Sequence, residues 1–209
     1  MTILQALLLF TLAAGLLTIT PGLDTLLVLR TCVASGARAA LLAGAGVCCG
    51  CLVWGVLVAA GVGALLAVST LAYEVLRIAG AAYLLWLGLR LLWRPRSALP
   101  ANASPAGGAA QSFMRGVLTN LLNPKAGVFY ISFLPQFIPA GISPVAFGSL
   151  LALIHALEGL LWFALLTLAT RPLSQWLAQA RLVKALDRGT GAVFVLFGLR
   201  LAGGSARPA

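Results

Sequence analysis

The chain carries very little charge. Only 9% of its 209 residues are Asp, Glu, Lys or Arg, whereas 61% are hydrophobic, and a soluble domain has roughly 25% charged residues. The mean hydropathy is +1.05. A surface so short of charge cannot face water on all sides, so it must face lipid instead. We therefore expect an integral membrane protein rather than a soluble domain.

Acidic residues and histidine are scarce, with four carboxylates and one imidazole in the whole chain. Hydrolytic or metal-dependent catalysis relies on clusters of such groups, so we expect no enzyme activity, no metal site and no cofactor. A glycine-rich phosphate-binding loop with its lysine is also missing from the sequence. This absence argues against ATP hydrolysis by the chain itself.

The four cysteines lie in the first quarter of the chain and form no disulfide framework. Cys48 and Cys51 have the Cys-x-x-Cys spacing that a transmembrane thiol–disulfide carrier would use, but the second half of the chain has no partner cysteine. We interpret them as small packing residues and keep the thiol carrier as an alternative.

Six apolar runs can be traced, and a membrane crossing needs about 20 such residues. They cover approximately residues 3–33, 40–67, 72–93, 113–138, 144–170 and 182–203. Ser143-Pro144 opens the fifth run with an N-cap residue followed by proline at the first helical position. We expect an all-α membrane protein of six transmembrane helices, with a short interfacial helix at 173–183.

Basic residues indicate the orientation. The net charge of +10 comes from residues that fall between the apolar runs, so it does not indicate a nucleic-acid partner. These residues concentrate after the first, third and fifth runs, and the positive-inside rule then places those loops in the cytoplasm and both termini outside.

The two halves of the chain resemble each other. Gly88-Leu89-Arg90-Leu91 in the third run has the same residues as Gly198-Leu199-Arg200-Leu201 in the sixth. Three spans per copy invert the second copy across the membrane, as in many secondary transporters. The predicted boundaries are residues 1–96 for the first three-helix repeat, 97–111 for the linker and 112–209 for the second repeat.

The first helix of each half is predicted to be broken, at Thr20-Pro21-Gly22 and at Asn123-Pro124-Lys125. Thr and Asn are N-cap residues and proline tolerates the first helical position, so each pair restarts a half-helix inside the membrane. Freed backbone groups at that depth are tolerated only where they face protein or a wet cavity. The matched breaks in helices 1 and 4 therefore indicate a substrate site between the halves.

Two charged residues lie beside these breaks, Asp24 after the first and Lys125 after the second. Charges inside a membrane are costly and face a partner or a cavity. One alternative is that Asp24 and Lys125 pair with each other. The other is that Asp24 holds a substrate ammonium, while Lys125, Asn123 and the half-helix ends hold the carboxylate.

His155 and Glu158 lie three residues apart in the fifth run and share a helix face. A histidine titrates near neutral pH, so the two side chains are candidates for a proton relay. The alternative is a hydrogen-bonded structural pair.

The segment from Thr18 to Val28 resembles the first-span signature of the LysE/RhtB family of amino-acid exporters, although Leu23 replaces the second proline of its usual Pro-Gly-Pro. Asn123-Pro124-Lys125, continuing to Phe133-Leu134-Pro135-Gln136-Phe137, resembles its second signature. The resemblance covers the whole chain. It implies a multi-pass exporter of neutral or basic amino acids, or their relatives, in the bacterial inner membrane, driven by the proton gradient.

The sequence-based hypothesis is thus a secondary transporter whose partners are an amino-acid substrate, protons and membrane lipid. Glycine and alanine faces also allow a homodimer. The alternatives are the thiol–disulfide carrier, a non-transporting scaffold and an exporter of another small solute, such as a metal cation. The expected substrate contacts are Thr20, Pro21, Gly22, Asp24, Asn123, Pro124 and Lys125, with proton coupling by Glu158 and His155.

Overall fold

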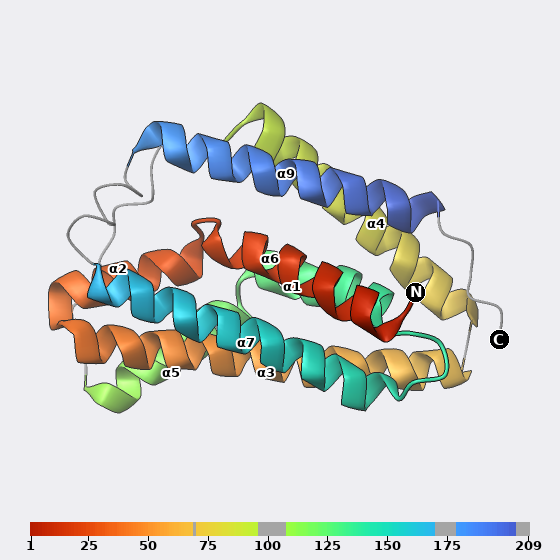
Figure 1. The fold of residues 1–209 in the computed structure, drawn as a ribbon, viewed down its shortest axis with the longest axis horizontal. Coiled ribbons are helices and arrows are strands. Elements are labelled where there is room, and N and C mark those ends of the chain that lie inside the picture. Colours follow the sequence, from red (N-terminus) through yellow and green to blue (C-terminus); the bar gives the residue numbers. More distant parts are fainter. Residues whose placement is uncertain (69, 96–107, 170–178, 204–209) are drawn as a thin grey trace.

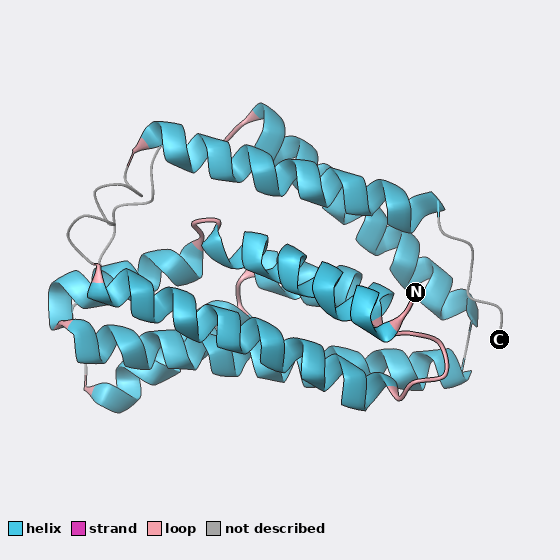
Figure 2. Cartoon of the chain, in the orientation of Figure 1, coloured by secondary structure: helices cyan, strands magenta, loops and turns pink. Residues whose placement is uncertain are grey.

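The computed structural model describes residues 1–68, 70–95, 108–169 and 179–203, and this part of the chain is helical, without β-strands (Figure 2). The prediction of an all-α protein is confirmed for these residues. The helices in chain order are α1 (Ile3–Ile19), α2 (Leu23–Ser35), α3 (Ala37–Val68), α4 (Thr70–Trp93), α5 (Ala109–Leu121), α6 (Pro124–Val128), the π-helix η1 (Phe129–Phe133), the 3-10 helix η2 (Leu134–Phe137), α7 (Pro144–Leu168) and α9 (Ala180–Gly203).

Two of the described helices are long and apolar enough to cross a membrane alone, Ala37–Gly61 within α3 and Pro144–Leu168. The pair α1 and α2 meets the same criteria when taken together, with a bend of 52° at its break. Length and composition therefore support up to three spans in the described residues. The count of six stays a prediction, partly because the fourth apolar run is divided into short helical pieces.

Helix α3 is the element against which α2, α5 and α7 are packed. It packs along α7 and α5 and also contacts α2 (Figure 1). Small residues allow this proximity: a Cβ atom at Gly46 would overlap the Phe113 carbonyl, and one at Gly116 would overlap the Ala43 carbonyl. Close approach through small side chains is the usual way in which helices associate in membranes.

Helices α4 and α9 form a pair that lies to one side of the other helices (Figure 1). A Cβ atom at Gly88 would lie 2.7 Å from the Gly191 carbonyl oxygen, and one at Gly191 would lie 2.7 Å from that of Gly88. A Cβ atom at Gly198 would lie 2.8 Å from the side chain of Leu85. Gly88 on α4 thus packs against α9, and Gly198 on α9 packs against α4.

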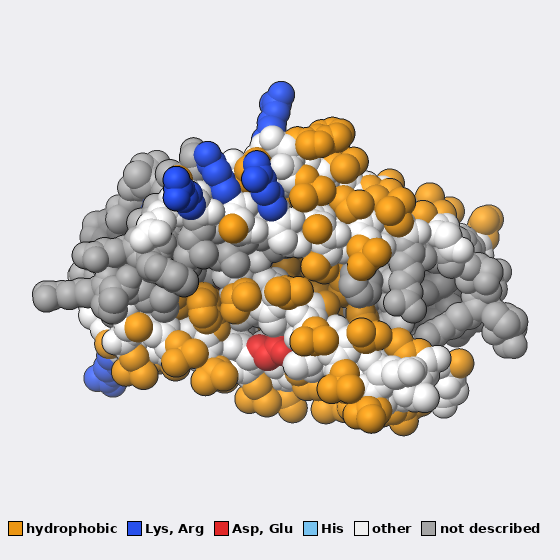
Figure 3. All heavy atoms as spheres, turned by 45° about the horizontal axis from the view of Figure 1, so that its top comes forward, with side chains coloured by type: hydrophobic (Ala, Val, Ile, Leu, Met, Phe, Trp, Pro, Cys, Tyr) orange, Lys and Arg blue, Asp and Glu red, His pale blue; other side chains and the backbone are white. Residues whose placement is uncertain are grey.

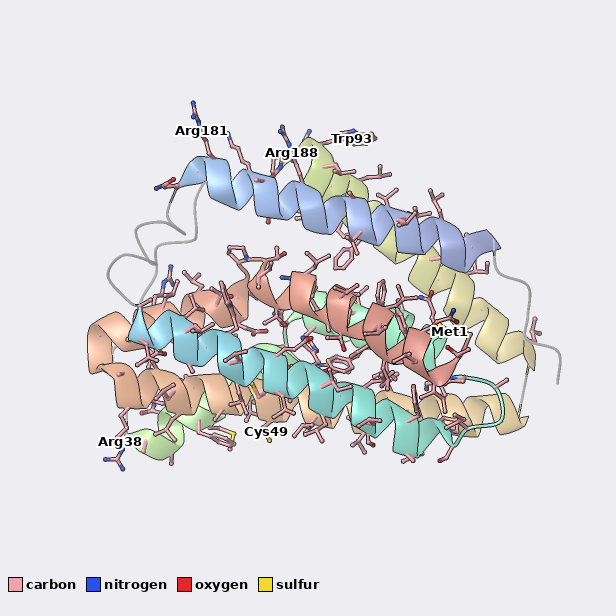
Figure 4. The ribbon with its side chains drawn as sticks, viewed as in Figure 1. Met1, Arg38, Cys49, Trp93, Arg181 and Arg188 are labelled. Atoms are coloured by element: carbon pink, nitrogen blue, oxygen red, sulfur yellow. The ribbon has the colours of Figure 1, made fainter. Side chains whose placement is uncertain are left out.

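Large hydrophobic side chains cover much of the outer surface (Figure 3). On α7, for example, Leu157, Leu161 and Leu168 are more than half exposed. The visible Lys and Arg side chains lie in the left half of the view, most of them along its upper part, and Figure 4 shows Arg181 and Arg188 pointing outward from α9. An apolar exterior of this extent fits lipid and not water.

The first residues of α7 and α5 can be compared with the helix starts predicted from the sequence. The Ser143 hydroxyl oxygen accepts a hydrogen bond of 3.4 Å from the Ala146 N–H, and Pro144 takes the first helical position, which confirms the predicted start of this helix. Helix α5 begins at Ala109, inside the predicted linker. Most of that linker and most of the predicted interfacial helix fall within 96–107 and 170–178, outside the described residues.

Gly116→Ala is expected to destabilise the protein, because the new methyl group would overlap the backbone carbonyl of Ala43, which cannot rotate away. Overpacking typically costs about 1–3 kcal/mol. The measurement is the thermal midpoint of detergent-purified protein. Gly61→Ala is the matched control, since no atom lies within 4 Å of a Cβ at that position. Equal midpoints for the two variants would contradict the close packing of α3 and α5.

Candidate functional site

The first helix break lies between Ile19, where α1 ends, and Leu23, where α2 begins. The Thr20 hydroxyl donates a hydrogen bond of 2.6 Å back to the Leu16 carbonyl oxygen. Gly22 takes the N-cap position of α2 in an extended conformation, without a side-chain cap. The prediction that Thr20 caps the second half-helix is therefore wrong, because its hydroxyl bonds to the preceding helix instead.

The second helix break follows the predicted geometry. Asn123 is the N-cap of α6, and its side-chain oxygen accepts a hydrogen bond of 3.0 Å from the Lys125 N–H, with Pro124 at the start of the helix. After Val128 the chain continues through the π-helix η1 and the 3-10 helix η2. Such irregular turns are frequent at functional positions within helices.

Asp24 lies in the first turn of α2 and is held by residues around the other break. Its Oδ2 atom accepts hydrogen bonds from the side-chain amides of Asn120, at 3.0 Å, and Asn123, at 3.1 Å. Its Oδ1 atom is buried and has no hydrogen-bond partner in the described part of the chain. The carboxylate is thus oriented by two amides and retains one oxygen that can accept.

The Lys125 side chain hydrogen-bonds to the C-terminal end of α1. Its Nζ atom donates hydrogen bonds of 3.0 Å to the Leu17 carbonyl and 2.9 Å to the Thr20 carbonyl. These carbonyls end a helix and carry the negative end of its dipole, where an ammonium group is favourable. Asp24 therefore accepts from two amides of the second break, and Lys125 donates to the two carbonyls at the end of α1.

A cavity lies at the two breaks. Six of the residues predicted from the sequence line it, namely Thr20, Gly22, Asp24, Asn123, Lys125 and His155. Pro21 is buried beside the cavity without being among its lining residues, and Glu158 also lies outside its wall. The structure therefore brings most of the predicted residues from the two halves to one place.

Helices α3 and α7 complete the wall with Val47, Cys48, Cys51, Gly159 and Phe163. Cys49, between the two cysteines of the wall, lies on the outer side of α3 (Figure 4). The four cysteines, all within the described residues, are not joined by disulfide bonds. In the described residues, no three His, Cys, Asp or Glu side chains are grouped so that they could hold a metal ion.

His155 is buried and pairs with Tyr130 of η1. The Tyr130 hydroxyl lies 2.8 Å from the Nδ1 atom of His155. Glu158 makes no hydrogen bond with His155; one of its oxygens, Oε2, is buried without a partner in the described part of the chain, and the other faces Gly15 on α1. The hydrogen-bonded His155–Glu158 pair considered from the sequence is thus replaced by a His155–Tyr130 pair.

Sequence reasoning missed two residues of this site, Asn120 and Tyr130. Asn120 is only 1% exposed, and its side-chain amide contacts both Asp24 and, at 3.5 Å, the sulfur of Cys51. Its signal was a polar side chain in an apolar run, three residues before the predicted break at Asn123. Tyr130 had no comparable signal, because its partner lies on another helix.

Known proteins are similar to this chain over nearly its whole length. The family described as LysE type translocator matches residues 15–205. A homoserine/homoserine lactone efflux protein of Salmonella typhimurium is 34% identical over 96% of each chain. A leucine efflux protein of Enterobacter sp. (strain 638) is 34% identical over 92% of this chain and 93% of its own, and a threonine efflux protein of Salmonella typhi is 31% identical over 87% and 89%. No solved structure matches.

Lys125→Met is expected to lower stability, because two carbonyls at the end of α1 lose a charged donor. Leaving buried acceptors without a partner costs about 1–3 kcal/mol. The measurement is the tryptophan-fluorescence melting midpoint of the purified protein. Lys184→Met on the exposed part of α9 is the matched control. If both variants melt like the parent protein, the Lys125 ammonium does not support the break.

Proposed function

Because this chain belongs to the LysE type translocator family, we propose that it is a secondary exporter of amino acids or their close derivatives. Relatives that cover nearly the whole chain are named as efflux proteins for homoserine and its lactone, for leucine and for threonine. Family membership and these names identify a membrane transporter rather than an enzyme. The cavity at the two breaks supports an amino-acid substrate, because the described residues in its wall include one carboxylate, of Asp24, and one ammonium group, of Lys125.

The proposed architecture has six transmembrane helices in two inverted repeats, residues 1–96 and 112–209, joined by the linker 97–111. The order of elements supports it, since each half begins with an interrupted helix and continues with two long ones. Gly88 on α4 packs against α9, and Gly198 on α9 packs against α4. This exchange of contacts also fits two copies related by a two-fold axis. The bacterial relatives support a multi-pass location in the inner membrane.

The proposed substrate is a zwitterion lying between the two breaks. Asp24 binds the substrate ammonium through its Oδ1 atom, which has no other hydrogen-bond partner in the described residues. Lys125 binds the substrate carboxylate through its ammonium group, which lines the same cavity. Asn120 and Asn123 act as positioning residues, because their amides orient the Asp24 carboxylate.

The remaining predicted residues have supporting roles in this proposal. Thr20 and Gly22 form part of the cavity wall, and Pro21 and Pro124 interrupt the helices. The assignment of Asn123 and the half-helix ends to the substrate carboxylate stays a prediction, since the Asn123 side chain already bonds Asp24 and the Lys125 N–H.

Proton coupling is proposed to involve Glu158 and His155 on α7. His155 lines the cavity and so connects it to Tyr130. Glu158 lies one turn further along α7, with the buried oxygen Oε2 unpartnered in the described residues. A carboxyl group in such a place can accept a proton without breaking a hydrogen bond, which suits a group that must change its charge during transport.

The proposal predicts substrate-dependent efflux. Cells loaded with a panel of amino acids should lose at least one faster when they contain the protein, and an uncoupler should abolish the difference. Asp24→Asn keeps the shape of the side chain but removes the charge that binds the ammonium, so it should reduce efflux about 100-fold or more. Efflux is measured per amount of protein found in the membrane. Unchanged efflux by Asp24→Asn would refute the site.

Two further variants separate the proposal from its rivals. Lys184→Ala, on the exposed part of α9, should leave efflux unchanged and serves as the control for a change of charge. The double variant Cys48→Ser, Cys51→Ser should retain measurable efflux, because the two residues line the cavity but carry out no redox step in this proposal. A thiol–disulfide carrier predicts complete loss of activity in the double variant, and a scaffold predicts no efflux from any form of the protein.

Glu158→Gln should uncouple transport from protons. In proteoliposomes with an imposed pH gradient, the variant should fail to accumulate substrate, because its side chain cannot take up a proton. Exchange of labelled for unlabelled substrate without a gradient should persist, since that assay requires no net proton movement. Equal loss in both assays would assign Glu158 to folding or binding and remove it from the coupling step.

A further inference from the structure

A groove on the outer surface of α4 lies apart from the cavity at the two breaks. It is lined by Trp86, Leu89, Arg90, Trp93 and Arg94, in the last two turns of the helix. We propose that this α4 groove binds the phosphate headgroup of an anionic phospholipid. The proposal concerns a lipid partner of the protein and does not depend on which solute the protein exports.

The spacing of the lining residues places them on one face of α4. Arg90 follows Trp86 by four residues, Arg94 follows Arg90 by four, and Trp93 follows Trp86 by seven. These are the separations of neighbours along a helix surface. Trp86 is 52% exposed and Trp93 is 77% exposed, and both arginines are exposed as well. The groove thus presents two guanidinium groups and two indole rings to the surroundings of the protein.

The Arg90 guanidinium is held in place by an aromatic ring. Its central carbon lies 5.4 Å from the centroid of the Trp86 ring, within the range of a cation–π contact. Such a contact orients the guanidinium without neutralising its charge, as a carboxylate partner would. An oriented guanidinium can bind two oxygens of one phosphate group, and it loses less conformational freedom when the ligand binds.

The charge in the α4 groove is not balanced by a carboxylate, since none is among the residues that line it. On α4, Glu74 lies sixteen residues before Arg90, more than four helical turns away. On α9, Asp187 is fully buried and does not line the groove. A zwitterionic headgroup also carries a phosphate, but its ammonium group would meet two guanidinium charges. The groove therefore favours an anionic headgroup.

The position of the groove favours a lipid over a soluble anion. The predicted orientation places the linker after α4 in the cytoplasm. Tryptophan is enriched where a membrane meets water, and the cytoplasmic surface of a membrane carries anionic lipids that attract basic segments. Figure 4 shows Trp93 and Arg188 pointing outward from the pair α4 and α9, away from the other helices. An indole ring on that side contacts the apolar part of a lipid, while the arginines reach its phosphate.

The second half of the chain provides an internal comparison. The Gly-Leu-Arg-Leu motif of α4 recurs in α9 as Gly198-Leu199-Arg200-Leu201. With the same offset, Leu196 takes the place of Trp86, and Gly203 takes that of Trp93. The motif that packs the two helices is thus present in both halves, whereas the two tryptophans are present only on α4. Helix packing therefore does not account for them.

The test measures which phospholipid contacts these tryptophans. The purified full chain is reconstituted in liposomes of equal parts phosphatidylglycerol and phosphatidylcholine, with brominated acyl chains on one lipid or the other. Bromine quenches tryptophan fluorescence on contact, and the quenching that is lost in the variant Trp86→Phe, Trp93→Phe reports on the groove. Phosphatidylglycerol should be preferred there about 10-fold or more, because each basic residue near a membrane surface contributes a factor of about 5. Equal quenching by the two lipids would overturn the proposal.

Variants of the arginines separate a bound lipid from a general attraction of basic residues to the membrane. The double variant Arg90→Gln, Arg94→Gln should abolish the preference. Arg38→Gln removes an exposed arginine of α3 on the same predicted side of the membrane and should leave it unchanged. An equal loss in Arg38→Gln would overturn the proposal. If the double variant does not fold, the single variants decide, and each should lower the preference about 5-fold.

Inorganic phosphate separates a lipid headgroup from a soluble anion. Millimolar phosphate should leave the preference for phosphatidylglycerol unchanged, because the lipid is also held by its acyl chains. Loss of the preference in phosphate would assign the groove to a soluble phosphate group and overturn the lipid assignment. These measurements involve no transport, so their failure would leave the exporter proposal to be judged by efflux alone.

Discussion

Hydrogen bonds between the two helix breaks hold the centre of this protein together. Lys125, beside the second break, donates to the carbonyls of Leu17 and Thr20, where the first half-helix ends. Asp24, beside the first break, accepts from Asn123 at the second. Backbone and carboxylate groups without partners are costly away from water. Each break therefore depends on side chains from the other, and the two have to lie together.

This dependence links structure to the transport that we propose. The groups that stabilise the breaks, the Lys125 ammonium and the Asp24 carboxylate, are also those assigned to the ends of a zwitterionic substrate. A bound substrate carboxylate would compete with the α1 carbonyls for Lys125, so occupancy of the site and the geometry of the first break are coupled. Glycine-mediated packing of α3 against α5 and α7 provides the firm wall opposite these groups.

Local signals in the sequence predicted the features that depend on neighbouring residues. Ser143-Pro144 starts α7 and Asn123-Pro124 starts α6, because an N-cap side chain bonds an N–H group two or three residues later. Thr20 breaks this rule, since its hydroxyl bonds back to Leu16. Two residues, Pro21 and Gly22, separate it from α2, and the carbonyl one turn earlier is the nearer partner.

The sequence by itself determined the helical class, the membrane environment, the positions of the breaks and the family, because composition, proline and capping residues act locally or over the whole chain. Only the tertiary structure decided the partners within the site. It joined Asp24 to the side-chain amides of Asn120 and Asn123, and His155 to Tyr130 instead of Glu158. These pairs come from different helices, and their distances depend on how closely small residues let the helices approach. The residue pattern along one helix does not show how closely another helix approaches it.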